Sequence, residues 1–399
     1  MPSSTARGAS PAIRCGAAMA TQADLADAVK QAVDEAHQPL GDEPADLTFI
    51  FATGSYGNAL RPAFEMLGDL APSRCLIGTT AEGVLAGDRE REREPAVAVW
   101  TARLPGTTVT PFAIDYTQTP DGGSFQGWPA DLHWPEHGAL LLVADPFSFP
   151  VDRLIQRLDE DHPGFPVIGG MASGGGRPGA NTLLLNRQTF TAGAVGVLIS
   201  GATRVRPLVS QGCRPIGQPL VVTKATDNML VELGGRPAFT QLQDLYGVLD
   251  DRDRRLMRTS LHLGRVASEY QDRFGRGDFL VRNVLGADPE TGVVAIGDQI
   301  RVGQTVQFHV RDADTAHEDL SELLRHEVER PPAGCLVFTC NGRGTRLFPA
   351  PSHDALCLQE ALGPVPSAGF FAQGELGPIG RKNCVHGFTA SIALFTAAD

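Results

Sequence analysis

Short apolar runs recur along the chain, and each is bounded by glycines or by a polar loop, which is typical of buried strands. The first strands of three similar series lie at residues 47–51, 139–144 and 335–339. Each series continues with a helical stretch, a second strand, the motif G-x-x-A-x-G and a third strand. The motifs occupy residues 78–83, 169–174 and 369–374. Because the whole order recurs, and not the motif alone, the pattern predicts three copies of one supersecondary unit.

Helical periodicity predicts a helix inside each unit, and the expected positions are 58–67, 151–159 and 353–362. A further amphipathic helix is predicted at 22–37, where Thr21 and Asp24 form a variant of the capping box. The second strands are expected at 75–77, 166–168 and 365–368. The third strands are expected at 96–100, 194–199 and 388–395.

The middle of the chain follows a different pattern. Residues 201–224 lack helical periodicity and contain three prolines, which predicts a domain boundary. The segments 278–285 and 291–296 are typical of a hairpin around a turn with proline and glycine, and 306–310 alternates like a half-buried strand. A capped helix is predicted to follow from Thr315. This stretch predicts an antiparallel portion ahead of the third unit.

A chain of 399 residues is too long for one ordinary core, so two domains are expected. The predicted fold class is mixed α/β: two domains built from repeated strand–helix–strand–loop–strand units with mixed sheets, plus an antiparallel portion in the second domain. The expected boundaries are a disordered start at 1–13, a first domain at 14–205, a junction at 206–224 and a second domain at 225–396.

Composition and charge narrow the functional classes. The formal charge of −12 disfavours binding to phosphate backbones, so no nucleic-acid partner is expected. No apolar run in the sequence approaches the roughly 18 residues of a membrane helix, so no membrane partner is expected either. The seven cysteines are scattered without a C-x-x-C pair, which indicates reduced thiols and a cytoplasmic location. The strong preference for arginine over lysine indicates a GC-rich, bacterial genome.

The densest polar cluster follows the strand at 335–339 and consists of Cys340, Asn341, Gly342, Arg343 and Gly344, with Arg346 nearby. Polar residues at the carboxyl end of a strand lie where open α/β sheets bind their ligands. The glycines would let backbone N–H groups point into a concavity, and the planar guanidinium of Arg343 suits a carboxylate. The alternative is that Asn341 and Gly342 form only a tight turn and that the arginines are solvated.

Two acidic residues occupy similar positions in the motif loops, because Glu82 lies inside the first motif and Glu375 directly follows the third. A carboxylate in such a loop is predicted to hold the ammonium group of a ligand. The alternative is an exposed acid, or a partner for a nearby arginine. Thr80 of the first motif and His386, which begins the last strand segment, complete the predicted ligand-binding residues.

An enzyme is a second possibility. Cys340 with either His353 or His386 would form a nucleophile–base pair if the fold brought them together, although nothing in their spacing requires it. The sequence has no Walker A, H-E-x-x-H, G-x-S-x-G or dinucleotide-binding pattern. It also has no paired-ligand spacing, so neither a metal nor another cofactor is predicted.

Several segments resemble the FIST domain family. The segments F-T-C-N-G-R-G (338–344), A-G-F-F-A-Q-G-E-L-G-P (368–378) and H-G-F-T-A-S-I (386–392) look like the hallmarks of the FIST C-terminal domain. Segments 278–283, 288–292 and 212–217 are similar to the family as well, and 77–83 and 167–174 resemble the FIST N-terminal domain. The resemblance runs from about Arg14 to Phe395, so it assigns these two domains to the predicted halves of the chain.

The resemblance implies a sensory module, since the family name stands for F-box and intracellular signal transduction and its domains are proposed to bind small ligands. The 13 residues before the matching part cannot hold an F-box, so output through a protein partner is expected. We therefore expect an intracellular sensor whose ligand is an amino acid or another small carboxylate. An enzyme, or a protein–protein interaction domain without a small ligand, is the alternative.

Overall fold

The computed structural model describes residues 12–59, 71, 73–120, 122–271 and 273–398. Residues 1–11 of the predicted disordered start lie outside the described residues, as do residues 60–67 of the helix expected near 58–67. Among the helices of the described part, none is long and apolar enough to cross a membrane.

Each of the three predicted units forms a sheet with the same strand order. A central parallel pair is followed by the antiparallel third strand of the unit and then by a further antiparallel strand. In the first unit these strands are β2 (Leu47–Thr53), β3 (Leu76–Ala81), β6 (Val97–Arg103) and β1 (Arg14–Ala20). In the second they are β9 (Gly138–Ala144), β10 (Val167–Met171), β13 (Ala194–Gly201) and β7 (Thr107–Thr117), with β8 (Ser124–Gln126) at the edge. In the third they are β22 (Gly334–Cys340), β23 (Ser367–Ala372), β26 (Thr389–Ala397) and β14 (Thr203–Gln211), which confirms the three copies.

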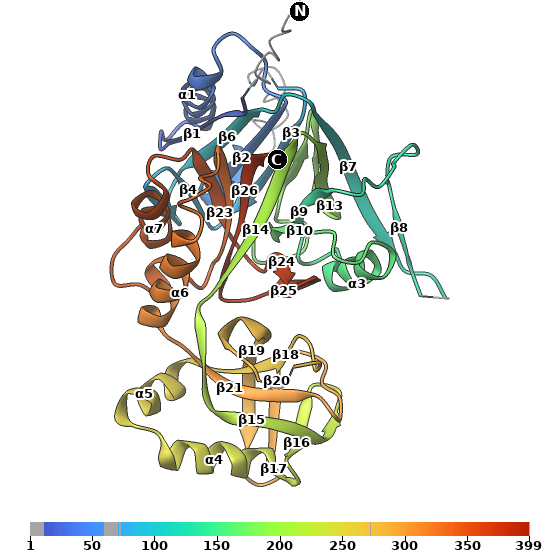
Figure 1. Ribbon diagram of the computed structural model, residues 1–399, viewed down its shortest axis with the longest axis vertical. Helices are drawn as coiled ribbons and strands as arrows, with labels where there is room; N and C mark the ends of the chain where they lie inside the picture. Colours follow the sequence, from blue (N-terminus) through green and yellow to red (C-terminus); the bar gives the residue numbers. More distant parts are fainter. Residues whose placement is uncertain (1–11, 60–70, 72, 121, 272, 399) are drawn as a thin grey trace, which may run out of the picture.

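A hairpin that follows each motif pairs with the sheet of another unit. The hairpin of β4 (Gly83–Ala86) and β5 (Arg89–Glu92) leaves the first unit and joins β23. The hairpin of β11 (Leu183–Leu185) and β12 (Gln188–Phe190) leaves the second unit and joins β3. The hairpin of β24 (Glu375–Ile379) and β25 (Lys382–His386) leaves the third unit and joins β10 (Figure 1). This exchange closes a ring of three units and covers one edge of every sheet.

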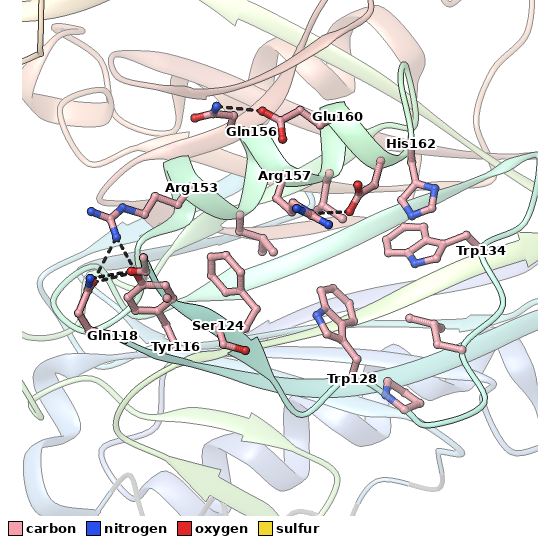
Figure 2. A pocket seen from close by; sticks show the side chains of 18 residues that line it. Tyr116, Gln118, Ser124, Trp128, Trp134, Arg153, Gln156, Arg157, Glu160 and His162 are labelled. Atoms are coloured by element: carbon pink, nitrogen blue, oxygen red, sulfur yellow. Dashed lines mark hydrogen bonds and ion pairs between the residues drawn. The ribbon is translucent and has the colours of Figure 1, made fainter. Parts of the chain in front are cut away.

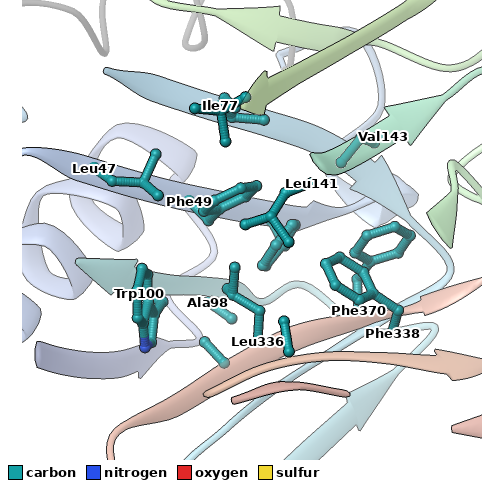
Figure 3. Packing of buried hydrophobic residues seen from close by; sticks show 14 of the residues in the cluster. Leu47, Phe49, Ile77, Ala98, Trp100, Leu141, Val143, Leu336, Phe338 and Phe370 are labelled. Atoms are coloured by element: carbon teal, nitrogen blue, oxygen red, sulfur yellow. The ribbon is translucent and has the colours of Figure 1, made fainter. Parts of the chain in front are cut away.

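The three sheets enclose a shared apolar core, to which Phe49 of β2, Leu141 of β9 and Phe338 of β22 all contribute (Figure 3). The residues that alternate with them, such as Ile50 and Leu142, pack outward against helices. The covering helices are α1 (Leu25–His37) on the first sheet, α3 (Val151–Asp161) on the second, and α6 (Ala313–Arg325) and α7 (His353–Leu362) on the third. The central strands β2, β9 and β22 are apolar at most positions because both of their faces are buried.

Residues 213–311 form a separate sheet whose strands are all antiparallel, and we call this part the antiparallel module. Figure 1 shows it below the three-unit body, reached where β14 continues into β15. Its strands are β15 (Cys213–Thr226), β16 (Met229–Leu233), β17 (Arg236–Pro237), β18 (Leu261–Val266), β19 (Phe279–Asp288), β20 (Val293–Ile296) and β21 (Thr305–Arg311). Its helices are α4 (Ala238–Val248) and α5 (Asp251–Ser260), with a short 3-10 helix at Arg276–Asp278. Outside the module, short 3-10 helices lie at Gln38–Leu40, Gly54–Ala59 and Gly344–Arg346. The pairing of β19 with β20 confirms the predicted hairpin.

Three local predictions are corrected by the structure. Helix α1 begins at Leu25 and is capped by Asp24, whose side chain accepts from the amide of Asp27, so the capping box at Thr21 was wrong. Helix α6 begins at Ala313, two residues before the predicted cap. The strand at 306–310 is buried at every position, because the polar side chains also find partners: the amide of Gln307 donates to the Gly217 carbonyl.

Candidate functional site

The three glycine motifs form the corners at which the chain leaves one sheet and enters the next. In the motif G-x-x-A-x-G, the sixth residue is a glycine and the third residue directly precedes the alanine. At each corner, the sixth residue of one motif contacts the third residue of another motif. A Cβ added to that glycine would lie closer than 3.0 Å to its neighbour. The pairs are Gly83 with Phe371, Gly174 with Thr80, and Gly374 with Met171. The three bends therefore meet at one end of the three-unit body, and the absence of a side chain at each glycine permits this approach.

A hollow of about 420 Å³ lies beside this meeting point, between the third unit and the antiparallel module. The carboxyl ends of the parallel strands β22 and β23 line it with Cys340, Asn341, Gln373 and Gly374. The antiparallel module lines it with Val281, Arg282, Asn283, Gly297 and Asp298. The remaining lining residues are Asp152, Met171, Val385, His386, Gly387 and Phe388. Open α/β sheets place ligands at this edge of their parallel strands.

Charges of both signs face the hollow. Two guanidinium groups share one carboxylate oxygen, since Arg282 Nε and Arg265 Nη2 both lie 3.3 Å from Oδ2 of Asp298. Arg282 also donates from Nη1 to the backbone carbonyl of Val385 at 3.0 Å, which joins the module to the third unit. Asp152, in the first turn of α3, adds an exposed carboxylate to the same lining.

The hollow adjoins a wider groove of about 960 Å³ between α3, the β24–β25 hairpin and the module. The hollow and the groove share Asp152, Arg282, Asp298 and Val385. The groove adds further charged side chains, among them Arg265, Arg301, Lys382, Asp159 and Glu160. A molecule bound in this cleft would contact both the three-unit body and the module.

Arg343 is not available to a ligand. Its fully buried guanidinium donates to both oxygens of Asp354, from Nε to Oδ2 at 2.8 Å and from Nη2 to Oδ1 at 2.7 Å. It also lies over the ring of Phe348, 5.2 Å from the centroid. Although burial alone would raise the pKa of Asp354, the Arg343 guanidinium holds that pKa well below its usual range. The predicted carboxylate-binding role of Arg343 is wrong, because the protein supplies the carboxylate itself.

Glu375 is also fully buried, and it is not among the residues that line the hollow. Its Oε2 accepts from the amide of Thr389 at 3.1 Å and from the Thr389 hydroxyl at 2.7 Å. Burial raises the pKa of Glu375 to about 8, although the bonds from Thr389 oppose this shift. The carboxyl group bonds to Thr389 within the protein and does not line the hollow, so the predicted role of Glu375 is corrected as well.

Glu82 and Arg346 do come together, from the first and third units, but they pair with each other. Arg346 Nη2 donates to Glu82 Oε1 at 2.6 Å and Nη1 donates to Oε2 at 3.0 Å. Nη1 also donates to the carbonyl of Asn341 at 2.7 Å. Thr80 is buried, and its hydroxyl accepts from the amide of Thr182 at 3.0 Å. These three side chains therefore hold the corners together, and their predicted ligand contacts are replaced by contacts within the protein.

The loop after β22 uses its own backbone groups. The amide of Asn341 donates to the carbonyl of Ala372 at 2.8 Å. The amide of Arg343 donates to the carbonyl of Cys340, also at 2.8 Å. The carbonyl of Gly342 accepts from Arg311 Nη1 at 3.0 Å, which fastens the loop to the module. Gly344 has a φ of 55°, and a Cβ there would lie 2.5 Å from Glu92 Oε1. The amide of Gly342 lies 3.4 Å from Cys340 Sγ, so the N–H groups of Asn341 and Gly342 already have partners within the protein and are not free as the predicted nest requires, whereas Asn341 does line the hollow.

Cys340 and His386 line the same hollow, but their electrostatics do not suit a nucleophile and its base. Burial, and then the nearby Glu375, raise the pKa of Cys340 well above its usual range. Burial lowers the pKa of His386 to about 4, and its Nε2 bonds the carbonyl of Gly377 at 3.0 Å. A reactive thiolate needs the opposite shift. His353 lies with Cys357 instead, at the far side of the sheet, so it does not serve Cys340.

A cavity of about 870 Å³ lies elsewhere, between α3 and the strands β7 and β8 (Figure 2). Its lining includes the aromatic rings of Tyr116, Phe125, Trp128 and Trp134, and the ring of Trp134 stacks on His162 with 4.1 Å between the centroids. Its polar side chains bond to one another, as Arg157 does with Asp161 at 2.7 Å and as Arg153 does with Gln118 at 3.3 Å. We place the candidate site at the hollow instead, because the loops of the third unit converge there.

Sequence reasoning missed the charged residues that the structure places at the hollow. Arg282 lies in the segment 278–283, whose residues carry a resemblance to the family but no charge pattern that indicates a site. Asp152 lies at the start of a predicted helix, where an acidic residue is ordinary. Asp298 follows β20 with no local pattern around it. Only the packing of the module against the three-unit body brings Arg282 and Asp298 close to Asp152, which lies in α3 of the second unit.

Comparison with known proteins gives matches over nearly the whole chain. Residues 46–236 match the FIST N domain, and residues 238–378 match the FIST C domain. Two proteins of Mycobacterium tuberculosis, "Uncharacterized protein MT0656" of strain CDC 1551 and "Uncharacterized protein Rv0628c" of strain H37Rv, are each 41% identical over 96% of this chain and 100% of their own length. "Uncharacterized protein Mb0898c" of Mycobacterium bovis is 39% identical over 96% of this chain and 99% of its own length. The protein therefore belongs to the FIST domain family, with a FIST N domain followed by a FIST C domain.

Proposed function

We propose that the protein is a cytoplasmic sensor that binds a small zwitterionic metabolite, an amino acid or another small carboxylate, in the hollow beside Arg282. FIST domains are associated with signal transduction and with the sensing of small ligands. One observation carries the proposal: a cation, Arg282, and two carboxylates, Asp152 and Asp298, face one hollow at the carboxyl ends of β22 and β23. A zwitterion carries the complementary pair of charges.

Arg282 is the side chain best suited to a ligand carboxylate. Its Nε contact with Asp298 is long, at 3.3 Å, and its Nη1 donates to the carbonyls of Val281 and Val385. Its Nη2 has no hydrogen bond within the described part of the chain, so a planar donor remains for the ligand. A hydrogen bond between charged groups contributes about 1.5–3 kcal/mol, which corresponds to roughly 10- to 100-fold in affinity.

The position of the hollow supports a signalling role as well as binding. Its lining comes from the second and third units on one side and from the module, at β19 and directly after β20, on the other. A ligand that contacts both parts favours the arrangement in which both contacts form, so binding would shift the population toward that arrangement. We propose that this shift is read by a protein partner.

The state of the cysteines supports the proposed cytoplasmic location, and the net charge supports the proposal that nucleic acid is not a partner. All seven cysteines are free and buried, which suits a reducing compartment. The net charge of −12 makes an unspecific nucleic-acid partner unfavourable.

The first test is a thermal-shift screen of amino acids and small carboxylates on the full chain, because a ligand that binds only the folded state raises the Tm. Arg282→Ala is expected to weaken the binding of any hit by about 10- to 100-fold without unfolding the protein. Arg255→Ala is the matched control, since Arg255 is an exposed arginine of α5 that does not line the hollow.

Two results would count against the proposal. One is a panel in which no amino acid or carboxylate raises the Tm. The other is a hit that binds the Arg282→Ala variant as tightly as it binds the unchanged protein and the Arg255→Ala control, which would move the ligand away from the hollow.

A further inference from the structure

A second cluster of polar side chains lies outside the hollow, where α6 and α7 pack together on the outer face of the third sheet. His317 of α6 faces His353 of α7, with 3.1 Å between His317 Nδ1 and His353 Nε2. The sulfur of Cys357 lies 3.5 Å from the same nitrogen of His317 and 3.7 Å from that of His353. His353 and Cys357 are four residues apart on one helix, so they project from the same face. Three ligand atoms of metal-binding type thus form a triangle.

The sides of this triangle match those of a tetrahedral zinc site. With Zn–N bonds of about 2.0–2.1 Å and a Zn–S bond of about 2.3 Å, tetrahedral angles place two nitrogens about 3.3 Å apart and nitrogen about 3.6 Å from sulfur. The observed separations of 3.1, 3.5 and 3.7 Å depart from these values by no more than about 0.2 Å. One ion can therefore contact all three atoms with almost no movement of the side chains.

The ring of His353 is held in the orientation that a metal requires. Its Nδ1 lies 2.9 Å from Oδ1 of the buried Asp354, and the ring stacks on Phe348 with 3.4 Å between centroids and 7° between planes. Asp354 is anchored in turn by Arg343 and by the hydroxyl of Thr339. A carboxylate that accepts from Nδ1–H selects the tautomer whose Nε2 lone pair points at the ion, which is the common support for a metal-binding histidine.

We propose that His317, His353 and Cys357 bind one zinc-type divalent cation, with a fourth coordination position open to water. One thiolate and two imidazoles favour zinc over magnesium or calcium, which prefer oxygen ligands. His317 is exposed, so the ion has a path from solvent. As the Zn–S bond forms, the Cys357 thiol loses its proton to the solvent. The ion would join α6 to α7, and the inference does not depend on the ligand proposed for the hollow.

The test uses the full chain, stripped of metal with a chelator and then titrated with Co²⁺ or Zn²⁺. Cobalt reports its own ligands, because a bound thiolate adds a charge-transfer band and tetrahedral coordination adds intense visible bands. We expect one Co²⁺ per chain with a thiolate band, displacement of Co²⁺ by Zn²⁺, and a higher Tm in the presence of Zn²⁺.

His317→Gln removes an exposed ligand and leaves the core unchanged. The loss of an outer-shell partner alone typically weakens metal binding about 10- to 100-fold, so His317→Gln is expected to weaken it at least about tenfold. Cys357→Ser is expected to remove the thiolate band. The matched control is His326→Gln, another exposed histidine at the end of the same helix, which should bind as the unchanged protein does. Failure of the unchanged protein to bind cobalt, or a thiolate band that survives in Cys357→Ser, would overturn the proposal.

Discussion

Buried polar side chains have roles in this protein that depend on the partner each one meets. Arg343 is fully buried and stays charged, because both oxygens of Asp354 accept its N–H groups. Removing one member of a buried ion pair leaves the other unpaired, which typically costs about 3–5 kcal/mol. Asp354 also accepts from His353, so a single carboxylate supports the loop after β22 and the proposed metal ligand.

Glu375 makes the stability of the protein depend on pH. Its pKa is raised by burial from 4.5 to about 8, so between these values the folded state keeps a proton that the unfolded state has lost. Stability therefore falls as pH rises through this window, by up to about 1.4 kcal/mol per pH unit. Glu375→Gln stays neutral and keeps an oxygen for Thr389, so we expect a flatter dependence of the free energy of unfolding on pH, measured by urea denaturation.

The free energies of unfolding are compared between pH 6.5 and 8. Below pH 6.5 the buried His386 has the opposite effect on stability. Its pKa is lowered to about 4 in the folded state, so as the pH falls the unfolded state binds a proton at His386 before the folded state does. Glu329→Gln, a change at an exposed glutamate, serves as the control. Equal slopes for Glu375→Gln and the unchanged protein would show that the carboxyl of Glu375 does not titrate in this range.

At the scale of elements, the first glycine of each motif sets how closely the two parallel strands approach. A Cβ at this glycine would collide with the carbonyl oxygen of the neighbouring parallel strand. The distances would be 1.8 Å from Gly369 to Val337, 1.9 Å from Gly169 to Leu142, and 2.8 Å from Gly78 to Ile50. Because the obstacle is backbone, it cannot rotate away, and the strands themselves would have to separate.

Gly369→Ala is therefore expected to destabilise the protein by about 3 kcal/mol or more, since overpacking against fixed atoms commonly costs 1–3 kcal/mol or more. Gly176→Ala is the matched control, because nothing lies within 4 Å of the Cβ it would add in an exposed loop. Thermal and urea denaturation of both variants give the comparison. Similar stabilities for the two variants would mean that the parallel strands can separate at little cost.

At the scale of the whole molecule, the exchanged hairpins make the two predicted halves depend on each other. A fragment ending at residue 205 would keep β10 but lose β24, which pairs with it. A fragment beginning at residue 206 would keep β23 but lose β4. Each fragment would also expose its share of the core that the three sheets enclose.

We therefore predict that fragments 1–205 and 206–399 are unfolded or aggregated when expressed separately, and that they form a one-to-one complex when expressed together. Circular dichroism and size-exclusion chromatography test this directly. The antiparallel module, 213–311, is the control, because its main core lies within its own residues and is expected to form alone. Cooperative melting of both isolated fragments as monomers would contradict the prediction.

The strands of the repeated units were predictable because of their burial. A strand such as β9, covered by the shared core on one face and by α3 on the other, is apolar at each position, and this leaves an unbroken run in the sequence. The hairpins after the motifs were not predicted. They are short, and β4 pairs with β23, nearly three hundred residues away, so no local pattern records the contact.

The candidate site, too, was predictable in one part and not in another. Its backbone frame, the loops after β22 and β23, could be expected from glycine and polar residues that follow a buried strand. The roles of its side chains could not. Arg343 and Arg282 are both arginines after or within a strand, yet one is buried against Asp354 and the other faces the hollow.

By itself, the amino-acid sequence determined the three units, the mixed α/β class and the family, because these follow from local periodicity and from motifs of contiguous residues. Only the tertiary structure decided which sheet each hairpin joins, which charges neutralise one another and which remain at the hollow. The physical reason is that burial and ion pairing act between atoms close in space, and here residues far apart in the chain supply those atoms.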